Sequence, residues 1–472
     1  MLVRLRTWWV EVQESLWFIP TILTLIAIGL AALTVWIDGL LLARGRVDVY
    51  LAFGGGAEGA RGVLSAIAGS LVTVTGVVFS ITIVALQLAS SQFSPRVLRN
   101  FTGDRANQAV LGTFIATFTY TLLVLRTVRS AGEDAMIFVP SISVTIAILL
   151  AMISIGLLIF YIHHAARSIQ AAVIIERVTN DVRGLVDRLF PDPVGEPVSG
   201  DSKNVIPPTA PTVVRAEHAG YLQVIDEDAL FRLQDRTPLA IRMEPRVGEF
   251  VLPGSGLASV WSLEPPDDEM ISSVRRAFVL GTERTLQHDI ELGFRQLADI
   301  ALKALSPGIN DPTTATTCID RLAEILVLLG NRRMPAALRT SPDGHVHLLA
   351  QETTFGRAVA LSFNQIRHFG AADATVATHL LATLERIAIL VPPDRRDSLL
   401  EQANAALRAA RHAVREPLDL TRIEQAFSQN SFGVLTPKES DSDLDDSDPG
   451  ANRPPQLSRR PANGRPGPDE AY

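Results

Sequence analysis

The stretch TVTGVVFSITIVALQLASSQFSPR, from Thr73 to Arg96, is apolar enough to cross a membrane, yet it carries hydroxyl and amide side chains at near-regular spacing. Four of these polar residues fall within about 40° of one another on a helix of ~100° per residue. They are Thr73, Ser80, Gln87 and Ser91. Two interpretations stay open: the stripe lines a water-filled path, or its small residues pack against another helix.

Three further apolar runs meet the length of roughly 20 residues that a ~30 Å hydrocarbon core requires. The four predicted membrane helices cover residues 16–37, 63–88, 109–128 and 136–162. The first run is too long for a signal peptide, and we expect it to stay as a helix. Hydrophobic residues make up 47% of the 472-residue chain. This composition favours a membrane domain over residues 1–190, with a helical extension after the fourth span, followed by a soluble part.

The arginines beside the predicted spans indicate an orientation. Nine lie on the side of the N-terminus: Arg4, Arg6, Arg96, Arg99, Arg105, Arg167, Arg177, Arg183 and Arg188. Five lie on the opposite side: Arg44, Arg46, Arg61, Arg126 and Arg129. Because basic residues favour the cytoplasmic side, both termini are predicted to be cytoplasmic. The net charge of −7 gives no electrostatic basis for binding nucleic acid.

Charge is also informative inside the spans, because the predicted helices contain no Asp, Glu, Lys or Arg except Arg126, near the end of the third. This pattern argues against a proton-coupled transporter or pump. Four short helices seldom enclose a conduit, so a pore requires a homo-oligomer in which the second helix of each subunit lines the axis. That helix ends at Ser94 and Pro95, and Arg96 and Arg99 would then ring the cytoplasmic mouth and favour anions.

The sequence after the membrane domain changes character twice. Residues 191–212 are rich in proline and small polar residues and read as a linker. Residues 213–262 alternate in short strands with glycine turns, which predicts a small β-barrel or sandwich. The run VGEFVLPGSGLASV resembles the barrel-sandwich hybrid of biotinyl and lipoyl domains. No lysine lies between Val213 and Trp261, so neither cofactor can be attached there, and we expect no cofactor.

Residues 266–430 are predicted to form a mostly helical cytoplasmic domain, because their apolar residues recur at helical spacing. The segment SPGINDPTT interrupts this pattern. Asp311 is a natural N-cap before Pro312, so one interpretation is a plain helix–turn–helix corner. In the other, Asn310, Asp311 and the free N–H groups of the following helix form a ligand site. The tail, residues 437–472, has too few apolar residues to fold.

Chemical motifs do not favour an enzyme. The single cysteine, Cys318, has no neighbouring base in the sequence to activate it. No phosphate-binding glycine loop, G-x-S-x-G elbow or H-E-x-x-H motif occurs. The histidines lack the spacing of a metal site. His288, Asp289 and Glu291 are predicted to lie on the solvated side of an amphipathic helix. We therefore expect no catalytic residue and no metal.

Two longer motifs carry a resemblance to a known family. They are TGVVFSITIVALQLASSQFSPRVLRNF (Thr75–Phe101) and RQLADIALKALSPGINDPTTA (Arg295–Ala315). Over residues 10 to 430 the chain resembles the bacterial predicted membrane proteins called domain-of-unknown-function family twenty-two fifty-four. The resemblance implies an integral protein of the bacterial inner membrane with a cytoplasmic C-terminal region, and it implies no activity.

Two functions therefore stand as hypotheses. The first is a homo-oligomeric channel or passive transporter that moves a small ion or solute along the second membrane helix. The second is a membrane-anchored sensor or scaffold, whose cytoplasmic part binds a ligand or partner while the helices anchor it in the bilayer.

Overall fold

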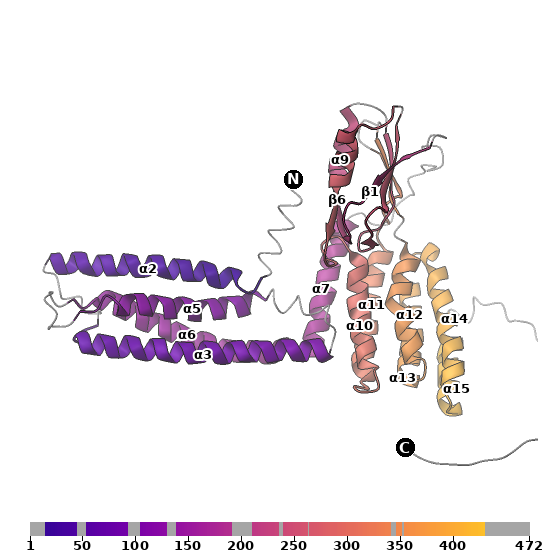
Figure 1. Cartoon of the computed structure of the whole chain (residues 1–472). Helices are drawn as coiled ribbons and strands as arrows, with labels where there is room; N and C mark the ends of the chain where they lie inside the picture. The colour runs from indigo at the N-terminus through magenta and orange to yellow at the C-terminus, as the bar shows by residue number, and fades with distance from the viewer. Residues whose placement is uncertain are drawn as a thin grey trace, which may run out of the picture.

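The computed structural model describes residues 15–44, 53–92, 104–129, 138–190, 210–235, 239–262, 264–340, 346–351 and 354–429. Over these ranges the chain is mostly helical, with its strands concentrated in the C-terminal part. Figure 1 shows a bundle of long helices from the N-terminal part, and a second group of helices, with the sheets beside it, at one end of that bundle.

Four helices are long and apolar enough to cross a membrane, which confirms the four predicted spans. They are α2 (Phe18–Ala43), α3 (Ala57–Gln92), α5 (Arg105–Leu125) and α6 (Ser141–Ser168). A helix satisfies its own backbone polar groups, so apolar runs of this length adopt it in lipid. With 36 residues, α3 is the longest of the four. At ~1.5 Å per residue it measures about 54 Å, well beyond a ~30 Å hydrocarbon core.

The bundle is held together around α5, which packs against α2, α3 and α6. Large side chains fill its interior, and Phe114 and Tyr120 of α5 and Tyr161 of α6 are all buried. The approach of α2 to α5 depends on Gly112, because a Cβ atom there would lie 2.9 Å from the Cα of Pro20. The described part of the bundle is therefore closely packed.

A buried carboxylate lies in α2, just beyond the predicted end of the first span. We expected the first span to end at residue 37 without any charge, but α2 continues to Ala43 and includes Asp38, which is buried. Asp38 accepts hydrogen bonds from the backbone N–H groups of Ile142 and Ser143, both at 3.0 Å, and from the Ser143 hydroxyl at 2.6 Å. A carboxylate of α2 therefore caps the N-terminus of α6.

After α6 the chain changes direction. We expected one continuous helix to about residue 190, but α6 ends at Ser168 and α7 (Ala171–Leu189) begins three residues later. Figure 1 shows α7 running across the axis of the membrane bundle. One face of α7 is apolar and buried, whereas its other face is charged and exposed.

The buried face of α7 belongs to a helical core shared with six later helices. These are α10 (Ile290–Ala304), α11 (Pro312–Gly330), α12 (Phe355–Gly370), α13 (Ala374–Leu390), α14 (Arg396–Ala413) and α15 (Pro417–Gln429). Figure 1 shows them side by side, with α7 nearest the membrane bundle. Leu86, near the end of α3, also packs against this core. The membrane bundle and the helical core therefore meet at α3 and α7.

The strands form two sheets. One has the order β1 (Thr212–Arg215), β5 (Gly256–Ser262), β3 (Leu239–Met243), β8 (Val346–Leu349) and β7 (Leu338–Thr340). The other has the order β4 (Phe250–Val251), β2 (Gly220–Ile225) and β6 (Phe278–Gly281). Apolar residues of both sheets and of α9 (Asp268–Ala277) share one core. Two short helical segments, α8 (Glu227–Phe231) and η3 (Arg232–Asp235), join β2 to β3, and η4 (Pro393–Arg395) precedes α14.

The predicted barrel needs correction. The described strands form no closed barrel, and three of them come from residues that we expected to be helical. β6 interrupts the segment between α9 and α10, and β8 pairs in parallel with β3 over the register Leu239–Val346. Pairing between segments so far apart in sequence leaves no local periodicity from which it could be predicted. Residues 191–209 of the predicted linker, and all of the predicted tail, lie outside the described residues.

Candidate functional site

The polar stripe of α3 lies on the outer surface of the membrane bundle. Thr73, Ser80 and Gln87 are exposed, whereas Leu71 and Val78, on another face of α3, are buried against α5 and α6. The polar stripe thus faces away from the bundle, on an outer surface that it shares with exposed apolar residues such as Val77 and Val84. The helical backbone of Ser91 is described but its side chain is not, and Arg96 and Arg99 lie outside the described residues.

Two glycines beside the stripe, Gly69 and Gly76, have open space beside them and contact no other described helix. A Cβ atom added at Gly69 or at Gly76 would meet no other atom within 4 Å. The Thr73 hydroxyl donates to the Gly69 carbonyl at 3.2 Å, so this side chain satisfies itself on its own helix. Small residues on a membrane helix allow close approach of another helix, and none of the described helices makes that approach at Gly69 or Gly76.

The polar residues on the inward side of α3 have partners within the bundle. The Thr82 hydroxyl lies 2.7 Å from the Tyr161 hydroxyl, which also lies 3.1 Å from the Val78 carbonyl. At ~100° per residue Thr75 and Thr82 lie on the face of α3 opposite the stripe, and the Thr75 hydroxyl donates to the Leu71 carbonyl at 2.6 Å. These inward hydroxyls join helices and do not line a path.

The segment SPGIND, the predicted ligand site, forms the corner between α10 and α11. Asp311 caps α11, accepting from the Thr314 backbone N–H at 3.0 Å and the Thr314 hydroxyl at 2.6 Å. These hydrogen bonds lower the pKa of Asp311. Asn310 is exposed and has a φ of +49°, in the left-handed region that asparagine tolerates. The geometry is that of the helix–turn–helix corner, with the Asp311 carboxylate engaged by its own helix.

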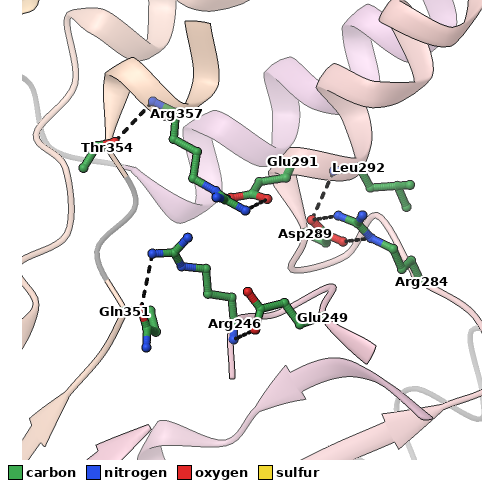
Figure 2. Close-up of polar contacts among 9 residues, drawn as sticks. All are labelled: Arg246, Glu249, Arg284, Asp289, Glu291, Leu292, Gln351, Thr354 and Arg357. Atoms are coloured by element: carbon green, nitrogen blue, oxygen red, sulfur yellow. Dashed lines mark hydrogen bonds and ion pairs between the residues drawn. The ribbon is translucent and has the colours of Figure 1, made fainter. Parts of the chain in front are cut away.

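A second polar cluster lies where the sheets meet the helical core, and Figure 2 shows its residues apart from Gly248. We call it the junction; its members are Arg246, Gly248, Glu249, Arg284, Asp289, Glu291, Gln351 and Arg357. Asp289 is 3% exposed and is the N-cap of α10, accepting from the Leu292 N–H at 3.1 Å. The Arg284 guanidinium donates to both of its oxygens, at 2.7 and 2.9 Å. Burial raises the pKa of Asp289, and the hydrogen bonds and charge of Arg284 oppose that rise.

A second ion pair of the junction joins two helices at their N-termini. Arg357, in the first turn of α12, makes two hydrogen bonds to Glu291, in the first turn of α10; the one from its Nη2 to Glu291 Oε2 measures 3.0 Å. This contact raises the pKa of Arg357. The Thr354 hydroxyl caps α12 by accepting from the Arg357 backbone N–H at 3.2 Å. The junction therefore fixes the starts of α10 and α12 relative to each other (Figure 2).

The sheets enter the junction through one tight turn. Gly248 has a φ of +90°, and a Cβ atom there would clash with Asp289 and lie 2.7 Å from Arg284. In the same turn the Arg246 N–H donates to Glu249 at 3.1 Å, and the Arg246 guanidinium donates to Gln351 at 3.3 Å. The turn can lie this close to α10 because residue 248 has no side chain.

Comparison with known proteins identifies the family. The family described as "Predicted membrane protein (DUF2254)" matches residues 13–386. The chain belongs to this family. It is 34% identical over 433 residues to "Uncharacterized protein Rv1290c" of Mycobacterium tuberculosis (strain ATCC 25618 / H37Rv) and, to the same extent, to "Uncharacterized protein Mb1321c" of Mycobacterium bovis (strain ATCC BAA-935 / AF2122/97). Each alignment covers 90% of this chain and 82% of the relative. No solved structure matches the chain.

In this DUF2254 protein, one carboxylate contacts both the membrane bundle and the helical core. Asp104 is the N-cap of α5, and its Oδ1 accepts from the Ala106 N–H at 2.9 Å. Its Oδ2 lies 3.0 Å from Nε2 of His164 in α6 and 3.5 Å from Arg177 in α7. The Asp104 side chain is only 8% exposed. Asp104, His164 and Arg177 therefore hold three helices together at the end of the bundle from which α7 departs.

Metal binding and nucleophilic chemistry depend on how side chains are grouped and exposed among the described residues. They contain no group of three or more His, Cys, Asp and Glu side chains placed to hold a metal ion. Cys318 is fully buried in the helical core, and burial raises its pKa far above the usual thiol value. A thiol in this setting is a poor nucleophile.

Sequence reasoning missed both charged clusters. Asp289 was expected on a solvated helix face, and this is wrong, because it is buried beneath Arg284. An Asp directly before the apolar run that starts at Ile290 is a typical N-cap signal and would have placed it at a helix start. The pairing of Arg357 with Glu291 joins residues 66 positions apart, and no local pattern indicates it.

Proposed function

We propose that this DUF2254 protein is a homo-oligomeric channel or passive transporter in which α3 of each subunit lines the path of a small ion or solute. The observation that carries the proposal is the outward position of Thr73, Ser80 and Gln87 on a membrane helix. A Gln side chain facing lipid lacks hydrogen-bond partners in the hydrocarbon, whereas one facing a water-filled axis or a second subunit has them.

The proposed path lies between subunits, and the packing of one subunit supports this. Phe114, Tyr120 and Tyr161 are completely or almost completely buried within the described bundle. Gly69 and Gly76 leave the stripe side of α3 free for close approach by a neighbouring α3. The bilayer is the bacterial inner membrane, with both termini in the cytoplasm, and Arg96 and Arg99 at the cytoplasmic mouth favour anions. As proposed, the protein is not an enzyme.

The stripe also has a direction along the path. Gln87 follows Thr82 by five residues, about 7.5 Å along the helix at ~1.5 Å per residue, and Thr82 is level with Tyr161 of α6. Gln87 is therefore near the end of the bundle that carries α7, whereas Thr73 and Ser80 lie deeper. A solute leaving the path at this end would pass Ser80 before Gln87.

Flux through purified protein in liposomes tests the proposal. Wild-type protein should pass small ions or solutes, and Ser80→Leu or Gln87→Leu should reduce that flux by about tenfold or more, because leucine replaces the polar lining. Ser70→Leu is the matched control, since Ser70 is exposed on α3 but lies about 80° round the helix from Ser80 at ~100° per residue. Absence of wild-type flux across a range of ions and voltages, or a strict monomer in mild detergent, would overturn the proposal.

A second candidate is a membrane-anchored sensor or scaffold, and one observation favours it. Among the described residues, Arg246 Nε and Thr285 Oγ1 are buried side-chain atoms with no hydrogen-bond partner, and both belong to or adjoin the junction. A ligand that accepts hydrogen bonds would satisfy them. Asn310 and Asp311 are the other proposed ligand residues, but Asp311 already caps α11. Ligand-induced thermal stabilisation that is lost in Arg246→Gln and kept in Asp311→Ser would support binding at the junction.

A further inference from the structure

Two contacts among the described residues, one polar and one apolar, tie the C-terminal region to the membrane bundle in addition to the covalent link from α6 to α7. The polar contact is the set formed by Asp104, His164 and Arg177. The apolar contact is Leu86 of α3, which packs against the helical core. Both lie at the same end of the bundle, and together we call them the joint.

The charge arrangement makes Asp104 the centre of the joint. One of its oxygens caps α5, and the other faces both His164 and Arg177. A carboxylate that is 8% exposed is costly to keep without partners, so its position depends on the groups that α6 and α7 supply. A displacement of α7 withdraws Arg177 and leaves the Asp104 charge with less compensation. The bundle therefore responds to the position of α7.

Rigid contacts continue from α7 to the junction. Gly293 of α10 packs directly on Val182 of α7, so closely that a side chain at residue 293 would clash. Glu291, two residues earlier, is held by Arg357 of α12, and Asp289 touches the turn at Gly248. A change in structure at the junction can therefore be transmitted to α7 through the continuous helix α10.

We infer that the C-terminal region regulates the α3 path through this joint. A displacement of α7 would move the ends of α3 and α6 that adjoin it. The inference rests on the proposed function for the flux it regulates. The joint itself is a mechanical link that can be measured without any flux.

The test compares variants of the full-length protein in liposomes. Asp104→Asn retains a capping oxygen for α5 but removes the charge that faces His164 and Arg177. Arg177→Gln removes the same ion pair without touching the cap, and Arg177→Lys restores the charge. Asp320→Asn is the control, because Asp320 also contacts a histidine and an arginine, His379 at 2.9 Å and Arg386 at 3.1 Å, on the exposed surface between α11 and α13.

Two readouts separate the possible outcomes. Hydrogen exchange should quicken about fivefold in the first turns of α7 and in residues 86–92 of α3 for Asp104→Asn and Arg177→Gln, and should stay near wild type for Arg177→Lys and Asp320→Asn. Where wild type conducts, the first two variants should also change flux several-fold. Faster hydrogen exchange confined to the first turn of α5, or equal effects of Asp104→Asn and Asp320→Asn on exchange, would contradict the inferred role of the joint. Absence of wild-type flux would overturn the proposed function alone. The hydrogen-exchange results would then still show whether the joint couples α7 to α3.

Discussion

The two oxygens of Asp289 each accept a hydrogen bond from the Arg284 guanidinium, at 2.7 and 2.9 Å, and the carboxylate is almost fully buried. Removing one partner of a buried ion pair leaves the other charge uncompensated. We expect Asp289→Asn to lower the free energy of unfolding of the C-terminal region by about 3 kcal/mol, measured by denaturant unfolding of the detergent-solubilised chain. Because Asn can still cap α10, the loss of stability would measure the contribution of the Asp289 charge and its pairing with Arg284.

The exposed pair Arg275–Glu217 provides the control for that experiment. Glu217 is 59% exposed, and exposed pairs contribute less than about 1 kcal/mol. Glu217→Gln should therefore change the unfolding midpoint little. Equal effects of Asp289→Asn and Glu217→Gln would show that the Asp289 pair contributes no more than a surface pair does.

Gly248 supports a second prediction, because its turn combines a positive φ with a close approach to Asp289. Gly248→Ala should destabilise the C-terminal region by about 2–3 kcal/mol, from backbone strain together with the displacement of Asp289 and Arg284. Gly254 has a similar φ of +82° but no atom within 4 Å of an added Cβ. Gly254→Ala should cost about 1 kcal/mol, from strain alone. Thermal unfolding of both variants separates the two contributions.

Asp311 predicts a dependence of stability on pH. Its pKa in the folded chain is lowered, chiefly by the hydrogen bonds of Thr314. The stabilisation is therefore present above the unfolded pKa of about 3.9 and is lost as pH falls through the lower, folded value. Asp311→Ala should cost about 1 kcal/mol at pH 7, and this cost should shrink in strong acid. Unfolding of both chains at several pH values measures it.

Serine at residue 311 is the control for that titration. Asp311→Ser keeps a capping oxygen but cannot ionise, so its stability relative to Asp311→Ala should not change with pH. A difference between serine and alanine that varies with acid as strongly as the difference between aspartate and alanine would contradict the assignment.

The cap that α2 supplies to α6 gives a fourth prediction. Asp38→Ala removes three hydrogen bonds from the start of α6 and should destabilise the bundle by about 2 kcal/mol. Asp38→Asn retains one acceptor oxygen and should cost less. Unfolding of the chain in mixed micelles measures both, and equal costs would indicate that the charge contributes more than the hydrogen bonds.

The sequence predicts the membrane part of this fold well because its signal is local. A run of about 20 apolar residues specifies a spanning helix without reference to any other segment. The same holds for the N-cap at Asp311, which depends on Thr314 only three residues later. Helical periodicity places Thr82 on the face of α3 opposite the stripe, and Thr82 contacts Tyr161 there, but periodicity alone left open which face meets the bundle.

Short strands were predicted in residues 213–262, where β1 to β5 lie, but the pairing of the two sheets and the contacts of the junction could not be predicted, because they join distant segments. The parallel pairing of β3 with β8 brings Leu239 beside Val346, and neither segment carries a pattern that names its partner. Arg357 meets Glu291 only after α10 and α12 have packed. The charge of Asp38 was placed beyond the first span because hydropathy falls near the end of α2, whereas helical structure continues to Ala43.

The burial of Cys318 allows a cysteine introduced in the membrane bundle to be labelled selectively. It is the only sulfhydryl in the chain, and the helical core shields it completely. A cysteine placed at Ser80 would thus be the sole thiol open to a water-soluble reagent in the folded chain. Its rate of modification would report directly whether that face of α3 is wetted, sealed against a neighbour or immersed in lipid.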